Sequence, residues 1–336
     1  MTIRQPVVAQ PRRAGEGEGL RRYLLDLDDF SREEIEVVLQ NTDAMKEVLH
    51  RDIKKIPTLR GKSVITLFYE ASTRTRVSFE QAGKILSADV INVSVGGSSV
   101  EKGESLYNTA LTLQAMNADI IVMRHPHSGA PHFLSRFLDA SVINAGDGMH
   151  AHPTQALLDI YTIKSHLGRV EGLKVVIVGD LLHSRVARSN LWGLTKMGAE
   201  VVLCAPPTLI PLDFLNGYRP EEGHPFASVK VETNVERAIE GADVVMALRL
   251  QLERQQAGYL PTLREYSKIY GITPKRLKLA KPNVLVMHPG PMNEGIEIDS
   301  EVAHGAQSVI EEQVTNGVAV RMATLYGIAT PIREGR

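Results

Sequence analysis

The sequence predicts an α/β fold built of two doubly wound parallel-sheet domains with a cleft between them. Apolar runs of strand length alternate with stretches of helical spacing along most of the chain. The runs are nearly continuous in Val, Ile and Leu, which is typical of parallel strands buried on both faces. The chain of 336 residues is also longer than the roughly 250–300 residues at which single hydrophobic cores stop growing, so two domains are expected.

The first domain is expected to start near Leu20, after an amino-terminal tail. Residues 1–19 contain Arg, Pro and Gly but no continuous apolar run, so they are interpreted as a mobile tail. Ser31, with Glu34 three positions later, predicts the start of a first helix because this pair can form a capping box. Strands are then expected at 63–69, 89–95, 119–125 and 141–147, with helical segments around 75–86, 103–116 and 131–139.

A second set of elements predicts the second domain. A long helix is expected from about Pro153 to Leu167, with a proline in its first turn. The hinge between the domains should therefore lie near 148–170. Further strands are expected at 173–180, 199–206, 242–249 and 282–290. A final helix at about 311–328 could return to the first domain and complete it.

The composition excludes several classes of partner. The 38 basic and 39 acidic side chains give a formal net charge of -1, so no global field favours nucleic acid or an anionic membrane. No segment approaches the roughly 18 apolar residues of a membrane span. Cys204 is the single cysteine, so an internal disulfide and a cysteine-rich zinc site are both excluded. This cysteine usage fits a reducing compartment, and a cytoplasmic location is expected.

The segment FYEASTRTRVSF predicts a phosphate site. A buried strand ends at Tyr69 and a helix begins within Ser72-Thr73-Arg74-Thr75-Arg76, which gathers hydroxyls, a guanidinium and unpaired backbone N–H groups at a helix amino terminus. The alternative is a capped helix with exposed arginines. Arginine in a first turn opposes the helix dipole, which weighs against that alternative. The pattern GxxxxGK[ST] is absent, so a nucleoside triphosphate is not the first candidate ligand.

Other polar groups follow the remaining strands of the first domain. A Gly- and Ser-rich loop carries Ser98 and Lys102, which could reach an anion, although a polar surface loop would look much the same. Arg124 closes the third strand, and His152 precedes a helix whose first turn contains Gln155. Ligands of α/β sheets bind beyond such strand ends, where these groups could hold a carbonyl oxygen. His152 could equally be a histidine whose ring is satisfied by backbone.

The second domain offers groups suited to carboxylates. The segment VVIVGDLLHSRVARSN follows a buried strand but has only Gly179 where dinucleotide folds carry GxGxxG, which disfavours a nicotinamide dehydrogenase. Arg185 stands at a helix start, Arg249 and Gln251 follow another strand, and a His-Pro-Gly-Pro turn occupies 288–291. Two guanidiniums in one cleft can bind a dicarboxylate. Scattered surface arginines remain the alternative.

No cofactor and no metal ion is expected from the sequence. The histidines lack the HExxH spacing and have no cysteine partners, so a zinc interpretation is weak. His125, His127 and His150 are interpreted as structural or solvent-exposed.

Taken in order, these motifs resemble the aspartate/ornithine carbamoyltransferase superfamily from about residue 20 to the end. They are STRTR, the Lys102 loop, Arg124-His125-Pro126, HPTQ, the Arg185 loop, Arg-x-Gln and HPGP. STRTR together with HPTQ is specific for the superfamily, and Arg249-Leu250-Gln251 with the last strand suggests the aspartate branch. Ornithine enzymes typically have His-Cys-Leu-Pro where this chain has His-Pro-Gly-Pro at 288–291. The thiol of that motif is missing here, because the single cysteine, Cys204, lies on another strand.

The resemblance implies an activity and a division of the chain. The carbamoyl group of carbamoyl phosphate would pass to the α-amine of L-aspartate, giving N-carbamoyl-L-aspartate and phosphate, an early step of de novo pyrimidine biosynthesis. The active site would lie in the cleft between the domains. Residues 20–152, completed by the helix at about 311–328, would form the carbamoyl-phosphate-binding domain, and 153–310 would form the aspartate-binding domain. Ornithine or another amino acid is the alternative acceptor.

The resemblance also assigns roles to individual residues. Carbamoyl phosphate would be bound by Ser72, Thr73, Arg74, Thr75, Ser98, Lys102, Arg124, His152, Gln155 and Gly290. Catalytic roles would fall to Arg74, Thr75, Lys102, Arg124 and His152. Aspartate would be bound by Lys102, Arg185, Arg249, Gln251, Gly290 and Pro291.

The resemblance further implies an oligomer. In the family, Ser98 and Lys102 enter the active site of a neighbouring subunit, which makes the catalytic unit a homotrimer with shared sites. Regulatory or pathway-enzyme subunits are possible partners, and a scaffold role of the tail at 1–19 could coexist with catalysis. One departure is Glu294, where many relatives have arginine, and it could alter loop packing or aspartate affinity.

Overall fold

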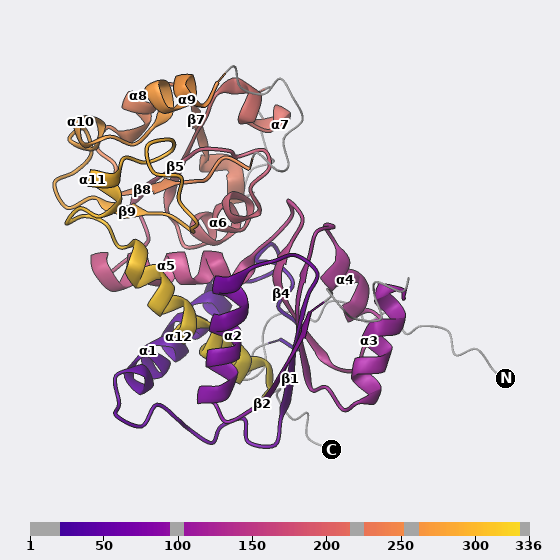
Figure 1. Ribbon diagram of the computed structural model, residues 1–336. Coiled ribbons are helices and arrows are strands. Elements are labelled where there is room, and N and C mark those ends of the chain that lie inside the picture. Colours follow the sequence, from indigo (N-terminus) through magenta and orange to yellow (C-terminus); the bar gives the residue numbers. More distant parts are fainter. Residues whose placement is uncertain (1–20, 95–103, 216–224, 252–261, 330–336) are drawn as a thin grey trace. The chain divides into compact units, whose positions relative to one another are not determined.

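The computed structural model describes residues 21–94, 104–215, 225–251 and 262–329 (Figure 1). The chain divides into two compact units. Unit 1 comprises Met1–Thr154 and Gly317–Arg336, and unit 2 comprises Gln155–Asn316. Each unit contains one sheet in which every strand pair is parallel, so the predicted class of two parallel-sheet α/β domains is confirmed. The predicted tail at 1–19 lies outside the described residues.

The sheet of unit 1 has four strands in the order β2-β1-β3-β4. Its strands are β1 (Ser63–Phe68), β2 (Asp89–Ser94), β3 (Ile120–His125) and β4 (Ser141–Asp147), close to the predicted positions. The central strand β3 is buried along its whole length, as its unbroken apolar start predicts. Because all four strands are parallel, their carboxyl ends share one edge of the sheet.

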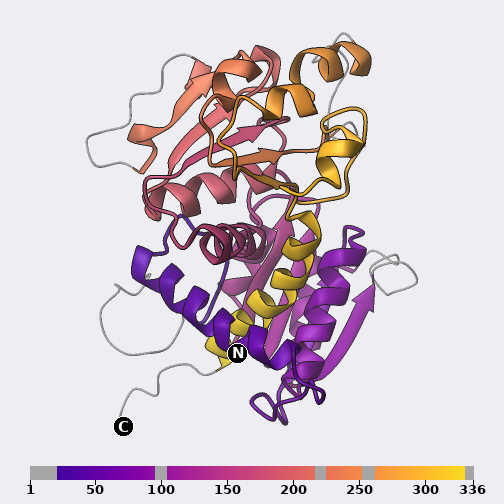
Figure 2. The ribbon, with the colours of Figure 1, turned by 90° about the vertical axis from the view of Figure 1, so that its left-hand side faces the viewer.

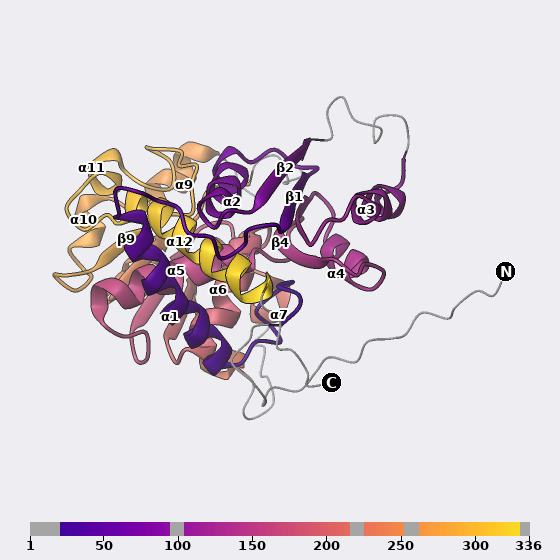
Figure 3. The same ribbon diagram turned by 90° about the horizontal axis from the view of Figure 1, so that it is seen from below.

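Helices cover both faces of this sheet. They are α1 (Arg32–Leu49), α2 (Thr73–Ile85), α3 (Leu106–Ala115), α4 (Ala130–Ser135) and, from Gly317 onward, α12 (Ile310–Ala329). Helices α1, α2 and α12 lie on one side, and α3 and α4 on the other (Figures 1 and 3). In the sheet, β2 lies on one side of β1, whereas β3 and β4 lie on its other side. Right-handed crossovers therefore place α2 on one face of the sheet and α3 and α4 on the opposite face.

The predicted capping box at the start of α1 is confirmed. Ser31 Oγ accepts a hydrogen bond from the backbone N–H of Glu34 at 3.2 Å, and Glu34 Oε2 accepts one from the backbone N–H of Ser31 at 2.8 Å. Two of the N–H groups that a helix start leaves unpaired are thereby satisfied.

The sheet of unit 2 has five strands in the order β7-β6-β5-β8-β9. They are β5 (Lys174–Val178), β6 (Glu200–Cys204), β7 (Lys230–Glu232), β8 (Val244–Ala247) and β9 (Leu285–Met287). Four of these match predicted strands, whereas β7 was not predicted. This edge strand has only three residues, two of them charged, so no apolar run marks it in the sequence.

The helices of unit 2 connect these strands. They are α5 (Pro153–Leu167), α6 (Arg185–Lys196), α7 (Leu212–Leu215), α8 (Val235–Ile239), α9 (Leu263–Tyr270), α10 (Pro274–Leu277) and α11 (Ser300–Ala303), with 3-10 turns at Pro207–Leu209 and Pro225–Ser228. The predicted helix from Pro153 to Leu167 is confirmed. The first turns of α12 run beside α5 (Figure 2), where Asn316 Nδ2 donates to Thr162 Oγ1 at 3.0 Å.

The single cysteine is part of the core of unit 2. Cys204 lies at the end of β6 and its side chain is buried. Burial raises the pKa of the Cys204 thiol to about 12, so the thiol stays protonated at neutral pH and is a poor nucleophile. Cys204 therefore acts as a small apolar residue. Within the described ranges, no helix combines the length and the apolar character that crossing a bilayer requires.

Candidate functional site

The predicted phosphate site lies where β1 passes into α2. Ser72 is the N-cap of α2 in an extended conformation, and its Oγ accepts from the backbone N–H of Thr75 at 3.4 Å. Thr73 and Arg74 are exposed in the first turn, whereas Thr75 is buried. No acidic residue occupies this turn, so nothing in it opposes the binding of an anion to the unpaired N–H groups.

Arg124 stands next to this helix start because β1 and β3 are neighbours in the sheet. Phe68 of β1 pairs with Arg124, and the backbone N–H of Tyr69 donates to the carbonyl of Arg124 at 2.9 Å. The guanidinium is held by Glu70, with which Nη2 forms an ion pair, and Nη1 donates to the carbonyl of Ala145 at 3.2 Å. These contacts fix a buried positive charge at the carboxyl end of β3.

His152 is positioned by a tight turn at the end of β4. The backbone N–H of Asp147 donates to the carbonyl of Ala151 at 3.1 Å, and Asp147 Oδ1 accepts from the N–H of Ala151 at 3.1 Å. Burial opposes ionisation of the Asp147 carboxyl, but hydrogen bonds from His150, Asn144 and Gly129 outweigh it and lower its pKa. The turn delivers a buried His152 directly before α5.

The fold thus brings three predicted groups of unit 1 to one edge. The Ser72 loop follows β1, Arg124 ends β3 and His152 follows β4, and these three strands are adjacent in the order β1-β3-β4. Parallel strands present their carboxyl ends at the same edge, which is where open α/β sheets bind ligands. Ser98 and Lys102 lie outside the described residues.

Gln155, at the start of unit 2, is oriented by a buried carboxylate. Gln155 Nε2 donates to Asp159 Oδ1 at 3.0 Å, one helical turn further along α5. Asp159 also accepts from Asn190 Nδ2 at 2.7 Å and from Gln313 Nε2 at 2.8 Å. With its amide N–H engaged in this way, Gln155 has its carbonyl oxygen as the group suited to accept a hydrogen bond from a ligand.

Arg185 begins α6 and is buried despite its charge. Ser184 caps this helix by accepting from the backbone N–H of Ala187 at 3.1 Å. The preceding loop is organised by Asp180, whose Oδ1 lies 2.9 Å from Nδ1 of His183 and accepts from the backbone N–H of His183 at 3.1 Å. Arg185 therefore lies at the buried start of α6, directly after the Asp180 loop at the carboxyl end of β5.

Arg249 and Gln251 lie beside that loop. Asp180 Oδ2 accepts from the backbone N–H of Gln251 at 3.2 Å, and Arg249 Nη2 donates to Gln251 Oε1 at 3.4 Å. The two loops approach closely at Gly179, where φ is 142° and an added Cβ would lie 2.6 Å from the carbonyl oxygen of Leu248. A side chain at Gly179 would therefore separate the loops, which explains the glycine at this position.

The His-Pro-Gly-Pro turn after β9 is held by a buried histidine. His288 Nδ1 accepts from the backbone N–H of Gly290 at 2.8 Å, so Nε2 is the protonated ring nitrogen, and it lies 3.2 Å from Glu297 Oε1. The Gly290-Pro291 peptide bond is cis. This turn neighbours the Arg249 segment because β9 pairs with β8.

Glu294 follows the same turn and contacts its own unit. His304 Nε2 lies 3.2 Å from Glu294 Oε1 at the end of α11. Hydrogen bonds from Ser300 and His304 lower the pKa of the Glu294 carboxyl, so it is ionised at neutral pH. The carboxylate is thus tied to the α11 region.

Several supporting residues were not among the predicted site residues. Glu70, Asp159, Asp180 and Glu297 hold the candidate ligand-binding groups in place but do not themselves belong to the predicted set. Asp159 offered one signal, since a carboxylate four positions after Gln155 interrupts an apolar helix face. Gln313 offered none, because it meets Asp159 only through the tertiary fold.

Chemically, the two groups of residues differ. The edge of unit 1 combines helix N–H groups, hydroxyls, a guanidinium and an imidazole, which suits a phosphate next to a polarised carbonyl. The edge of unit 2 combines two guanidiniums and a rigid turn, which suits carboxylates.

Two family models match two consecutive parts of the chain. The model of the aspartate/ornithine carbamoyltransferase carbamoyl-P binding domain matches residues 22–165, and the model of the Asp/Orn binding domain matches residues 171–328. The aspartate carbamoyltransferase catalytic subunit of Roseiflexus sp. (strain RS-1) is 60% identical over 320 residues, covering 95% of this chain and 98% of that protein. The corresponding subunit of Chloroflexus aggregans is 59% identical over 92% of this chain and 98% of its own length.

Solved structures give the same result. The aspartate transcarbamoylase of Trypanosoma cruzi in complex with carbamoyl aspartate and phosphate is 32% identical, with a TM-score of 0.81, and the match covers 91% of this chain and 95% of that one. The same enzyme in complex with N-(phosphonacetyl)-L-aspartic acid also gives a TM-score of 0.81 at 32% identity. With both family models matched and a relative at 60% identity, the chain belongs to the aspartate/ornithine carbamoyltransferase family.

Proposed function

We propose that this chain is the catalytic polypeptide of an aspartate carbamoyltransferase. It transfers the carbamoyl group of carbamoyl phosphate to the α-amine of L-aspartate and releases N-carbamoyl-L-aspartate and phosphate. The observation that carries the proposal is the helix start of α2, free of acidic residues, beside Arg124 and His152 at neighbouring strand ends. The names of the relatives and the ligands bound in the Trypanosoma cruzi structures support the same activity.

In this proposal, carbamoyl phosphate binds first and its phosphate occupies the start of α2. Ser72, Thr73, Arg74 and Thr75 contact the phosphate oxygens, with Lys102 and Ser98 from the neighbouring subunit. Backbone N–H groups and the helix dipole favour a dianion here, and the Arg74 guanidinium adds a charge-assisted hydrogen bond. Binding of the phosphate fixes the position of the carbamoyl group to which it is bonded.

The carbamoyl group is held by residues at the next strand ends. Thr75, Arg124 and His152 donate to its carbonyl oxygen, and the Gln155 carbonyl oxygen accepts from its amino group. The contacts from Glu70 to Arg124 and from Asp159 to Gln155 preset these orientations. Donors fixed before reaction stabilise the oxyanion at no reorganisation cost, and each is typically worth about 2.7–4 kcal/mol.

Aspartate is bound by the second group of residues. Its two carboxylates are matched by Arg185 and Arg249, with Gln251, Gly290, Pro291 and Lys102 completing the contacts. Ornithine carries an amine where aspartate carries its second carboxylate, so two guanidiniums favour aspartate. Aspartate is therefore the first candidate acceptor, and ornithine or another amino acid is the second.

The reaction then needs no covalent enzyme intermediate. The neutral α-amine of aspartate attacks the carbamoyl carbon and a C–N bond forms. The C–O bond to phosphate breaks, and phosphate leaves with the electron pair and accepts the proton from the amine. Arg74 and Lys102 stabilise the departing phosphate. Holding two substrates in reactive orientation can contribute about 7–11 kcal/mol, so positioning accounts for much of the rate.

A homotrimer with shared active sites is part of the proposal. Tyr107 of α3, Phe133 of α4 and Phe137 form an exposed aromatic cluster on unit 1, with ring centroids 5.0 to 6.5 Å apart. An exposed cluster of aromatic side chains is typical of a protein–protein interface. Tyr107 follows the segment that carries Ser98 and Lys102 closely in the sequence, so a second copy that docks on this cluster would contact a part of the chain next to that segment.

The proposed location is cytoplasmic, and the proposed pathway is pyrimidine biosynthesis.

The proposed function is tested by supplying the purified protein with carbamoyl phosphate and each acceptor in parallel. Phosphate release and carbamoyl-amino acid formation are measured with aspartate and with ornithine. Product with aspartate alone is expected. Product with ornithine alone would keep the phosphate site but refute the roles of Arg185 and Arg249, and no product with either would refute the proposed reaction.

Replacing Arg74 with Ala should lower kcat by about 10²–10³-fold, the usual effect of removing one charge-stabilising donor. Lys84→Ala is the matched control, because Lys84 is an exposed basic residue of the same helix that pairs with Glu80 at 2.6 Å. Circular dichroism should show the same helix content in both variants. Near-normal turnover of Arg74→Ala would contradict the assignment of this residue to the phosphate.

Replacing Phe133 with Asp should convert the trimer to smaller species, because a charge in a packed aromatic interface is strongly unfavourable. Mass is measured by light scattering after size-exclusion chromatography. Leu212→Asp is the control, because Leu212 of α7 is 71% exposed and lies in unit 2. A Phe133→Asp variant that keeps the wild-type mass would rule out this surface as the subunit contact.

A further inference from the structure

Three potential metal ligands of unit 1 have no part in the proposed reaction. His132 belongs to α4, Asp147 ends β4, and His150 lies in the turn that follows. One ligand atom from each of the three lies within 4.8 Å of the others. The imidazole rings of His132 and His150 meet edge to face with centroids 5.4 Å apart.

The chemistry of this set points to a divalent transition-metal ion. Two imidazoles and one carboxylate are the ligands typical of Zn²⁺ and similar ions, which bind them at about 2.0–2.2 Å. In a tetrahedral site with such bonds the ligand atoms lie about 3.3–3.6 Å apart, so rotations of the two rings must shorten the present separations, which are within 4.8 Å, to that spacing. The remaining positions would be filled by water.

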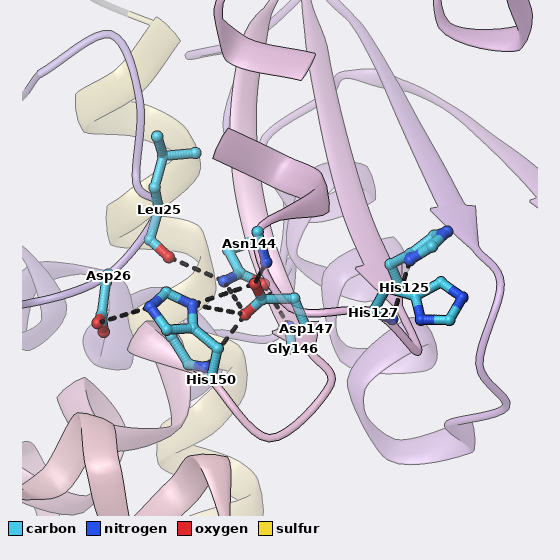
Figure 4. Close-up of polar contacts among 10 residues, drawn as sticks. Leu25, Asp26, His125, His127, Asn144, Gly146, Asp147 and His150 are labelled. Carbon is cyan, nitrogen blue, oxygen red and sulfur yellow. Dashed lines mark hydrogen bonds and ion pairs between the residues drawn. The ribbon is translucent and has the colours of Figure 1, made fainter. Parts of the chain in front are cut away.

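The surroundings of His150 and Asp147 match those of a metal site (Figure 4). His150 Nδ1 lies 3.1 Å from Asp147 Oδ2, and its other ring nitrogen, Nε2, faces Asp26 Oδ2 at 3.7 Å. A metal-binding histidine usually directs its second nitrogen at such an outer carboxylate. Asp147 is fixed by the backbone N–H of Gly129, which donates to Oδ2 at 2.6 Å.

His132 supplies an independent observation. Its Nδ1 is buried and has no hydrogen-bond partner among the residues that the structure describes. A buried polar atom without a partner is uncommon, and an ion or a water molecule is a usual explanation. The hydrogen bond between His150 and Asp147 explains the position of those two side chains, but it leaves the buried Nδ1 of His132 without a partner.

We propose that His132, Asp147 and His150 bind one divalent transition-metal ion, with Zn²⁺ as the representative ion. The ion links α4 to the turn between β4 and α5, two residues before His152. Its role is to stiffen this turn, and it takes no part in the transfer of the carbamoyl group. The inference is therefore independent of the proposed function.

Cobalt(II) binding tests the site. The full-length protein is treated with a chelator, freed of it by gel filtration, and titrated with Co²⁺ while the visible absorption is recorded. We expect one equivalent per chain to give the intense bands of a cobalt centre of low coordination number, and Zn²⁺ to abolish them by displacement. Absence of these bands at one equivalent would overturn the proposal.

Two variants identify the ligands. His132→Ala keeps the hydrogen bonds of Asp147 and should fold normally, yet it should weaken Co²⁺ binding by more than the roughly 10- to 100-fold effect of losing an outer partner. His127→Ala removes an exposed histidine of the same unit and should leave the affinity unchanged. Equal affinity in wild type and His132→Ala would show adventitious binding at surface histidines and refute the site. Circular dichroism checks the fold of each variant.

Discussion

The proposed binding of a phosphate dianion at the start of α2 is the interaction on which the other proposed contacts depend. Carbamoyl phosphate has few features other than its phosphate, so the position of that group determines where its carbon lies. The N–H groups of a helix start and the adjacent Arg74 provide the required positive potential only if no acidic side chain competes, and none occupies the first turn. The proposed roles of Arg124, His152 and Gln155 all follow from that placement.

Parallel sheets make this arrangement possible in each unit. Adjacent strands β1, β3 and β4 end at one edge, and so do β5, β8 and β9. Residues far apart in sequence thus become neighbours, and buried carboxylates hold them. Asp180 joins the loops after β5 and β8, while Asp159 joins α5, α6 and α12. Removing a hydrogen-bond donor from such a network leaves a buried carboxylate without a partner, which costs stability. Substitution of these acids or of the groups they position is therefore expected to be unfavourable.

Much of the fold could be predicted from the sequence because the signals are local. The capping box of Ser31 and Glu34, the Val- and Ile-rich strands and the helix after Pro153 each depend on residues within a few positions. Strand β7 was missed, since three residues carry no periodicity. The contact of Gln313 with Asp159 spans 154 positions, and the approach of His132 to Asp147 and His150 depends on how α4 packs on the sheet. Such contacts leave no local pattern. The predicted roles of the site residues, Ser98 and Lys102 among them, remain proposals.

The most direct measurement is a crystal structure of this protein with N-(phosphonacetyl)-L-aspartate, which joins a phosphonate to a dicarboxylate in one molecule. We expect the phosphonate at the start of α2, in contact with Ser72 and Arg74, and the two carboxylates at Arg185 and Arg249. A phosphonate bound away from α2, or carboxylates that contact neither arginine, would contradict this expectation.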